Sequence, residues 1–200
     1  MKNIKKQNIT FFDHWANLYD YSIPIKPWLV YIQKKAVDNI KLDNNIKILD
    51  IGCGTGDSLF YVSKLSNSKL FGVDISRNML KIAKKKLWNK AILKLGDVEN
   101  LPYINNTFDY VLNTEAFHHF PNPNLALKEI HRVLRKGGKL ILTDINFNCS
   151  IPHKLFKILE PGHVKIYNRK EFYNLFVRAG FKVLKQERVG LFAILTIGRK

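Results

Sequence analysis

The stretch ILDIGCGTGDS, residues 48–58, places three glycines in five positions directly after a run of aliphatic residues. A short aliphatic, β-branched run of this kind is typical of a strand buried on both faces of a parallel sheet. The glycines Gly52, Gly54 and Gly56 either supply a tight turn with positive φ or leave room for a nucleotide against the backbone. The residues from Asp57 onward read as a helix, so the stretch predicts a strand, a glycine loop and a helix in succession.

Outward from this loop, strand-like and helix-like segments alternate along the chain. Strand-like runs occupy residues 46–51, 69–75, 91–97, 108–114 and 139–145. Helical patterns occupy residues 27–40, 57–65, 76–88, 125–135 and 169–180, the fourth of them stopped by Gly137 and Gly138. Two last strand-like runs, residues 181–189 and 191–199, are separated by one glycine, a connection that only permits an antiparallel pair. This order predicts an α/β fold: a doubly wound, Rossmann-like, seven-stranded and mostly parallel sheet with a terminal antiparallel hairpin and helices on both faces.

A chain of 200 residues is expected to form one domain, and its N-terminal part differs in character from the rest. We assign residues 1–45 to a helical, aromatic cover segment, which begins with a short polar tail over residues 1–9, and residues 46–200 to the core. The run FFDHWANLYDY, residues 11–21, holds five aromatic residues. Three of them would share one face of a helix, namely Phe11, Trp15 and Tyr19. That face anchors the segment to the core, forms a lid that excludes water, or does both.

The formal net charge of +17 raises the question of a nucleic-acid partner. Of the 33 basic residues, however, 26 are Lys and 7 are Arg, and Arg is the residue better suited to bidentate phosphate and base contacts. Lys, Ile and Asn make up 66 of the 200 residues, and all three have A/T-rich codons. A biased genome would give this composition whatever the protein does, so the charge is weak evidence, and a nucleic-acid partner stays open without being favoured.

The cysteines and the chain start indicate where the protein works. Cys53 and Cys149 form no CxxC pair, which indicates a reducing compartment and argues against a disulfide scaffold or a zinc site. The start, MKNIKKQNIT, lacks the apolar core of a secretory signal, and no stretch reaches the apolar length of a membrane span. We expect a cytoplasmic protein without a membrane span, and no metal.

Acidic residues around the loop indicate which nucleotide it binds. Asp74 ends the second strand-like run, 20 residues after Gly54, where a carboxylate can accept hydrogen bonds from ribose hydroxyls. The NAD fingerprint GxGxxG would require a glycine at position 57, where this chain has an aspartate that would repel a pyrophosphate. Asp50, just before the loop, is a second acid in this place. A ligand without phosphates and with a cationic end suits both acids, which favours S-adenosylmethionine over NAD.

Successive segments of the chain resemble the motifs of the class I S-adenosylmethionine-dependent methyltransferases. The segments are ILDIGCGTGDS, GVDIS, GDVENLPYINNTFDYVLNTEAFHHFPNP and EIHRVLRKGGKLILTDI, within residues 46–145, echoed by Tyr19-Asp20 and by HVKIYNRKEFYNLFVRAGF. They look closest to the small single-domain group that includes quinone-biosynthesis and other small-molecule methyltransferases. The resemblance implies transfer of a methyl group by in-line displacement, with S-adenosylhomocysteine as the product.

The resemblance also implies a set of cofactor-binding residues. They are Tyr19, Asp50, Gly52, Cys53, Gly54, Gly56, Asp74, Ile75, Asp97, Val98, Asn113 and Thr114. In this interpretation Asp50 orients the cofactor's ammonium and Asp74 holds the ribose, while Ile75, Asp97 and Val98 contact the adenine. Tyr19 would lie near the methionine carboxylate, and the end of the fourth strand would lie beside the transferable methyl.

A base is needed only if the acceptor arrives protonated, and histidines are the candidates. His118, His119 and His163 are our candidate catalytic residues, with His153 as a further candidate, although a packing role explains each of them as well. Residues 146–167 are largely apolar and aromatic, and neither an NPPY-type motif nor a Pro-Cys nucleophile is present. These features favour a small organic acceptor. An RNA (rRNA or tRNA) methyltransferase and a non-catalytic S-adenosylmethionine-binding protein remain as alternatives.

Overall fold

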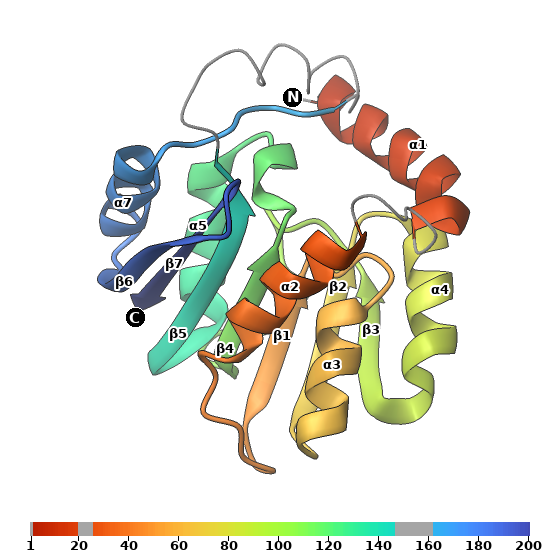
Figure 1. Ribbon diagram of the computed structural model, residues 1–200, viewed down its shortest axis with the longest axis horizontal. Coiled ribbons are helices and arrows are strands. Elements are labelled where there is room, and N and C mark those ends of the chain that lie inside the picture. Colours follow the sequence, from red (N-terminus) through yellow and green to blue (C-terminus); the bar gives the residue numbers. More distant parts are fainter. Residues whose placement is uncertain (1, 20–25, 147–161) are drawn as a thin grey trace.

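A seven-stranded sheet runs through the centre of the computed structural model, which describes residues 2–19, 26–146 and 162–200 (Figure 1). The strands are β1 (Lys47–Ile51), β2 (Lys69–Asp74), β3 (Ala91–Leu95), β4 (Phe108–Thr114), β5 (Leu134–Ile145), β6 (Lys182–Val189) and β7 (Ala193–Arg199). Their order in the sheet is β3-β2-β1-β4-β5-β7-β6. The order reverses between β1 and β4, and in such sheets a ligand binds beyond the carboxyl ends of the strands at this point.

The strand directions confirm a mostly parallel sheet with an antiparallel end. β1 pairs in parallel with both β2 and β4, while β7 pairs antiparallel with β5 and with β6. The hairpin turn is longer than the single glycine expected, because β6 ends at Val189 and β7 begins only at Ala193.

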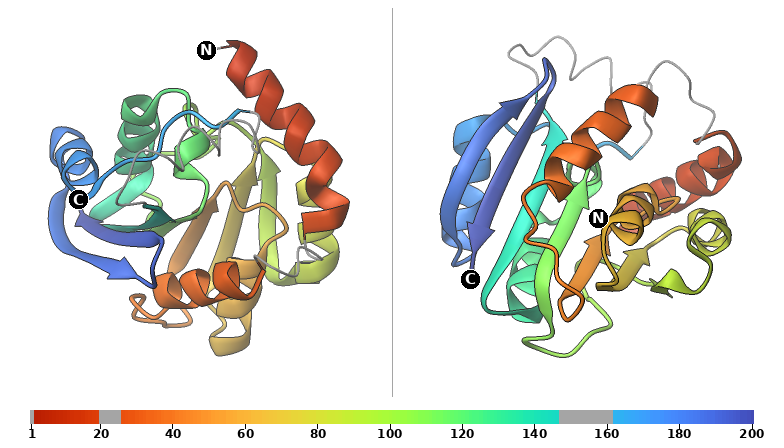
Figure 2. Two further views of the ribbon diagram at one scale, coloured as in Figure 1. Left: turned by 45° about the horizontal axis from the view of Figure 1, so that its top comes forward. Right: turned by 60° about the horizontal axis from the view of Figure 1, so that its bottom comes forward.

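Helices cover both faces of the sheet, as the alternating pattern predicts. The helices are α1 (Lys2–Tyr19), α2 (Lys26–Val37), α3 (Asp57–Leu65), α4 (Arg77–Leu87), α5 (Pro123–Val133) and α7 (Arg169–Arg178), with short 3-10 turns at Trp88–Lys90 and Phe117–His119. Side chains of α2, α3 and α4 pack into one buried cluster, and those of α5 and α7 pack into the other. Figure 2 shows these two layers on opposite sides of the sheet.

Side-chain caps fix the starts of several helices. Ser76 caps α4, as expected, by accepting a hydrogen bond from the backbone N–H of Met79 at 3.1 Å. Asn168 and Glu171 form a reciprocal capping box at the start of α7.

The end of α5 differs from the expectation. The helix ends at Val133, and β5 already begins at Leu134 and runs through both glycines. Gly137, with φ +80°, lies where the β4–β5 register shifts. The backbone N–H of Gly137 donates to the carbonyl of Lys200 at 3.0 Å, and the Lys200 ammonium donates to the carbonyl of Leu134 at 2.7 Å. These contacts with Lys200 hold residues 134–137 at the start of β5, where the sequence pattern predicted the end of a helix.

The expected polar tail over residues 1–9 is likewise wrong, because α1 is helical from Lys2. α1 lies beside α4 at the edge of the sheet where the strands β1 and β2 end (Figures 1 and 2). The predicted aromatic face is present: the Phe11 and Trp15 ring centroids are 5.4 Å apart, and those of Trp15 and Tyr19 are 5.1 Å apart.

Candidate cofactor site

A pocket opens at the carboxyl ends of β1, β2 and β4, where the sheet order reverses. It encloses about 930 Å³ of space, part of which is open solvent. Nine of the twelve cofactor-binding residues implied by the resemblance and one candidate catalytic histidine lie on its wall: Tyr19, Gly52, Cys53, Gly54, Asp74, Ile75, Asp97, Val98, Thr114 and His119. Asp50, Gly56, Asn113, His118 and His163 lie off this wall.

The three glycines of the loop have different reasons to be glycine. All have positive φ: +65° at Gly52, +50° at Gly54 and +83° at Gly56. A Cβ at Gly52 would lie 2.8 Å from the Ala116 Cβ, and one at Gly56 would lie 2.9 Å from Cδ1 of Leu87. At Gly54 no atom lies within 4 Å of such a Cβ, because this glycine faces the pocket. Gly54 therefore leaves space for a ligand, and the other two allow close packing.

Asp74 joins the loop to the start of α4. Its Oδ2 accepts a hydrogen bond from the backbone N–H of Gly54 at 2.8 Å, and its Oδ1 accepts one from Ser76 at 2.9 Å. Burial raises the pKa of Asp74, although these N–H groups oppose the rise. Each carboxylate oxygen has capacity for a second donor, as two adjacent ribose hydroxyls require.

Asp50 lies behind the glycine loop and is 1% exposed. Its Oδ1 has no hydrogen-bond partner among the residues that the structure describes. Burial, together with the charges of Asp74 and Asp57, raises the pKa of Asp50 well above its usual value. A buried acceptor without a partner in a negative surrounding fits a cationic group, and the ammonium of S-adenosylmethionine is one.

Two lysines neutralise Asp57, the acid at the first position of α3. Lys86 donates to its Oδ1 at 2.5 Å, and Lys26 pairs with its Oδ2. Lys86 also donates to the Thr55 hydroxyl at 3.1 Å. Neither lysine was singled out from the sequence, because each is distant along the chain from Asp57.

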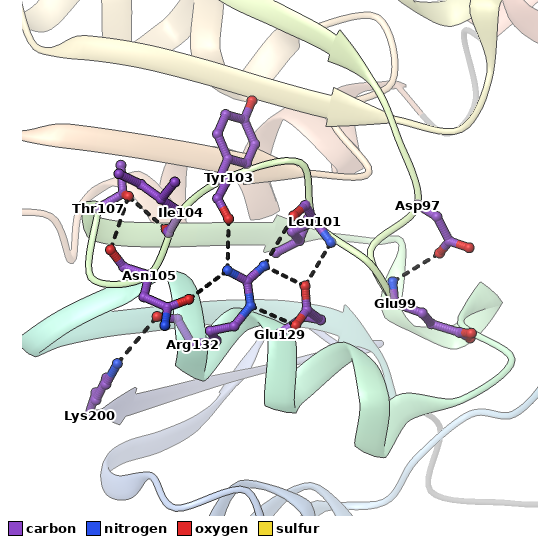
Figure 3. Close-up of polar contacts among 10 residues, drawn as sticks. All are labelled: Asp97, Glu99, Leu101, Tyr103, Ile104, Asn105, Thr107, Glu129, Arg132 and Lys200. Carbon is purple, nitrogen blue, oxygen red and sulfur yellow. Dashed lines mark hydrogen bonds and ion pairs between the residues drawn. The ribbon is translucent and has the colours of Figure 1, made fainter.

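The loop after β3 forms the other end of the pocket. The Asp97 Oδ1 accepts a hydrogen bond from the backbone N–H of Glu99 at 2.9 Å, which fixes the carboxylate. Arg132 of α5 holds the rest of this loop by donating to the carbonyls of Tyr103 at 2.7 Å and Leu101 at 3.1 Å (Figure 3). Glu129 accepts from the backbone N–H of Leu101 at 2.8 Å. The loop that carries Asp97 and Val98 is thus anchored to α5 by charged side chains.

α1 is fastened over the pocket at three points. Lys5 donates to Oδ2 of Asp97 at 2.6 Å. Asp13 accepts from the Ser76 hydroxyl at 2.5 Å, and Asn8 donates to the carbonyl of His119 at 3.0 Å. Lys5, Asn8, Phe12 and Tyr19 of this helix line the pocket. The pocket-facing aromatic residues are therefore Phe12 and Tyr19, and Phe12 is one that the expected face missed.

Known proteins share both the sequence and this architecture. The family described as "Methyltransferase domain" matches residues 49–142. The demethylmenaquinone methyltransferase of Staphylococcus epidermidis is 31% identical over 205 residues, covering 94% of this chain and 83% of the relative. That of Staphylococcus carnosus is 30% identical over 187 residues, covering 88% and 75%.

The chain belongs to the class I S-adenosylmethionine-dependent methyltransferases. The solved structure of such an enzyme from Thermotoga maritima shares the fold, with a TM-score of 0.77 at 23% identity over 96% of this chain and 99% of that one. S-adenosylmethionine is accordingly the cofactor of this methyltransferase. Among the described parts of the chain, no helix is long and apolar enough to cross a membrane.

The end of β4 carries further polar residues near the glycine loop of this methyltransferase. The Thr114 hydroxyl lies 3.1 Å from the Ser58 hydroxyl and lines the pocket. Asn113 is buried and donates to the carbonyl of Ile51 at 2.8 Å, so it ties β4 to β1 away from the pocket wall. Glu115 follows on the wall, and the sequence analysis did not single it out.

The three candidate histidines form one buried group, but only His119 lines the pocket. The His118 ring centroid lies 4.2 Å from that of His119 and 5.2 Å from that of His163. His118 Nδ1 lies 2.5 Å from Oδ1 of Asp144 at the end of β5, a partner that the sequence analysis missed. Burial, and then the charges of His118 and His163, lower the pKa of His119 well below 6.5, so its imidazole is neutral at pH 7.

Within the described residues, no group of three or more His, Cys, Asp and Glu side chains is arranged to hold a metal ion. His153 and most of residues 146–167, the segment expected to meet the acceptor, lie outside the residues that the structure describes.

Proposed function

We propose that this methyltransferase transfers its methyl group to a small organic acceptor with an aromatic ring. The observation that carries this proposal is the cover over the pocket: α1 closes it and contributes Phe12 and Tyr19, while Phe120 and His119 line it from the β4 side. A covered pocket of this kind suits a small aromatic molecule better than a polymer. The relatives named demethylmenaquinone methyltransferase support an acceptor of quinol type.

We assign the cofactor contacts as the resemblance implies. Asp74 would hold the ribose hydroxyls, and Asp97 with the Val98 backbone and the Ile75 side chain would hold the adenine. The loop from Gly52 through Cys53 and Gly54 to Gly56 would run along the methionine part, with Asp50 behind it for the ammonium, Tyr19 near the carboxylate, and Asn113 and Thr114 near the methyl. We also propose that residues 1–45 act as the cover and residues 46–200 as the core.

The charges around the glycine loop support this assignment. Lys26 and Lys86 pair with Asp57, and the neighbouring carboxylates Asp50 and Asp74 pair with no lysine among the described residues, so with all five groups ionised this part of the site carries one net negative charge. S-adenosylmethionine carries one net positive charge, from its ammonium, sulfonium and carboxylate. The site and the cofactor are therefore complementary in charge.

S-adenosylmethionine, when bound, supplies a methyl group on a sulfonium that passes to the acceptor by in-line displacement. For an acceptor with a hydroxyl, His119 is the histidine placed to receive the proton, because it lines the pocket and is neutral. His118 and His163 would support His119 from outside the pocket, and Asp144 would fix the orientation of the His118 ring.

The test is methyl transfer from labelled S-adenosylmethionine into a cell extract that is then divided into nuclease-treated and solvent-extracted fractions. Label in the organic or low-mass fraction, and much less label at the same cofactor concentration with an Asp74→Asn variant, is the expected result. Label that stays with macromolecules and disappears after nuclease would instead show an RNA methyltransferase. Tight cofactor binding without transfer to any fraction would show a non-catalytic binding protein.

A further inference from the structure

Gln33 is a buried polar residue on the wall of the pocket. It lies on α2 and is 9% exposed. The other buried residues of that helix are apolar: Leu29, Ile32, Ala36 and Val37. The Gln33 side chain lines the pocket and makes no hydrogen bond within the part of the chain that the structure describes. A buried amide without a partner costs stability, and a long side chain loses rotamer freedom on burial, so packing alone gives no reason for a glutamine at this position.

The helix that carries Gln33 borders the glycine-loop side of the pocket. Ile32, the residue before it, packs into the same buried cluster as Cys53 of that loop. Lys26 lies seven residues before Gln33, on the same face of the helix, and pairs with Asp57 at the start of α3. Gln33 therefore lies on the side of the pocket where the glycine loop is proposed to hold the methionine part of the cofactor.

The methionine part carries the one anionic group of S-adenosylmethionine, its carboxylate. Among the described residues of the wall, Lys5 is the only Lys or Arg, and it pairs with Asp97 at the far end of the pocket. Lys26 and Lys86 are engaged in ion pairs and do not line the wall. A carboxylate beside the glycine loop therefore needs neutral donors, and the amide of Gln33 offers two N–H groups.

We propose that the Gln33 carboxamide donates a hydrogen bond to the carboxylate of S-adenosylmethionine. This inference rests on the proposed orientation of the cofactor and adds a binding residue that the expected contacts do not include. Tyr19, proposed near the same carboxylate, is linked to α2 through Lys26, whose ammonium lies 5.2 Å from the centroid of the Tyr19 ring. Gln33 then distinguishes S-adenosylmethionine from adenosine derivatives that lack the carboxylate.

The test compares S-adenosylmethionine with decarboxylated S-adenosylmethionine, which differs from it only by the missing carboxylate. Calorimetry on the full chain measures the affinity for each ligand. Gln33→Met keeps the length of the side chain and removes the amide. This variant should bind S-adenosylmethionine about tenfold more weakly and should change the affinity for the decarboxylated ligand less than about twofold. An equal effect on both ligands, or no effect on S-adenosylmethionine, would overturn the proposal.

Two further variants make the result specific. Gln33→Glu keeps the shape and places a negative charge opposite the carboxylate, so it should weaken binding of S-adenosylmethionine more than tenfold without weakening that of the decarboxylated ligand. This variant also replaces Gln33→Met if the latter does not fold, and an equal loss for both ligands would contradict the proposal. Gln7→Met makes the same substitution at an exposed position of α1 and should leave both affinities unchanged.

The binding measurements separate this inference from the proposed function. Failure of the wild type to bind S-adenosylmethionine would contradict the proposed cofactor site itself. Normal binding by the wild type, with equal effects of Gln33→Met on both ligands, would contradict the role of Gln33 alone. The methyl acceptor takes no part in these measurements, so its identity does not affect their outcome.

Discussion

The ammonium of Lys5, near the start of the chain, lies 2.6 Å from Oδ2 of Asp97, the carboxylate that follows β3 at the far end of the pocket. The same ammonium lies 2.5 Å from Glu99. Burial acts to lower the pKa of Lys5, but these two carboxylates outweigh it and raise the pKa above its usual value. The cover is therefore fastened by a group that stays charged throughout the physiological range.

We expect Lys5→Ala to release the cofactor product faster. Without this ion pair α1 opens more often, and because the partners are partly exposed the loss corresponds to about 1 kcal/mol, or about fivefold in rate. The dissociation rate of S-adenosylhomocysteine, measured by stopped flow, tests this. Lys6→Ala is the matched control, because Lys6 is an exposed residue of the same helix. Equal rates for the two variants would show that α1 is not held closed by Lys5.

Alanine substitutions at two glycines can separate the effect of backbone strain from the effect of contact with the cofactor. Gly54 and Gly137 both have positive φ, and a Cβ at either position meets no atom within 4 Å. Alanine at either site should therefore cost about 1–2 kcal/mol of unfolding free energy from the backbone alone. Only Gly54→Ala places its methyl in the pocket, so only this variant should also lose affinity for S-adenosylmethionine. Thermal unfolding measures the stability of both variants, and calorimetry measures their affinity for S-adenosylmethionine. Equal affinities would show that the loop does not contact the cofactor.

Local patterns in the sequence were sufficient for the sheet and its glycine loop. The apolar runs, the glycines and the position of Asp74 each depend on neighbouring residues, and the structure places them as expected. The first half of α1 was missed because its polar residues gain stability from distant partners, as Lys5 does from Asp97, 92 positions away. The end of α5 was missed for a similar reason, since Lys200 supplies the hydrogen bonds there.

Within the pocket, the side chains placed by tertiary contacts or by an unusual backbone conformation were the hardest to predict. The pocket-facing side of α1 depends on how the helix is rotated, and the rotation is set by Asp13 against Ser76 and by Asn8 against Gly162. A Cβ at Gly162 would lie 1.8 Å from Oδ1 of Asn8, a constraint that appears only in three dimensions. Glu115 was missed because no local pattern signals its positive φ.

Asp74→Asn should weaken binding of S-adenosylmethionine while preserving the fold. The amide oxygen can still accept one backbone N–H, but the charge is lost, and a hydrogen bond to a charged group contributes about 1.5–3 kcal/mol, or roughly 10- to 150-fold in affinity. Asp38→Asn, at an exposed position, is the control. Calorimetry measures the affinity of both variants for S-adenosylmethionine. An affinity within twofold of the wild type for Asp74→Asn would argue against a ribose contact.

His119 gives a prediction for the pH dependence of the reaction. Its pKa is held well below 6.5 by burial and by the charges of His118 and His163, so the imidazole remains able to accept a proton below pH 6.5. We expect kcat/KM for a hydroxyl acceptor to be flat from pH 7.5 down past 6.5, and to fall only at a lower pH. His119→Gln should lose activity by about 10²- to 10⁴-fold if the residue is the base. An acid limb centred at 6.5, or a variant with normal activity, would contradict this role.

The lowered pKa of His119 also predicts how the free energy of unfolding depends on pH. Below pH 6.5 the unfolded chain protonates this histidine while the folded protein does not, so the unfolding free energy falls as the pH decreases, by at most about 1.4 kcal/mol per pH unit. This loss continues until the pH reaches the lowered pKa of the folded state. Urea unfolding at pH 7 and pH 5 should therefore show a smaller decrease for His119→Gln than for the wild type, because glutamine does not titrate. Equal decreases would show that His119 titrates normally in the folded protein and cannot be neutral in the way that the proposed proton transfer requires.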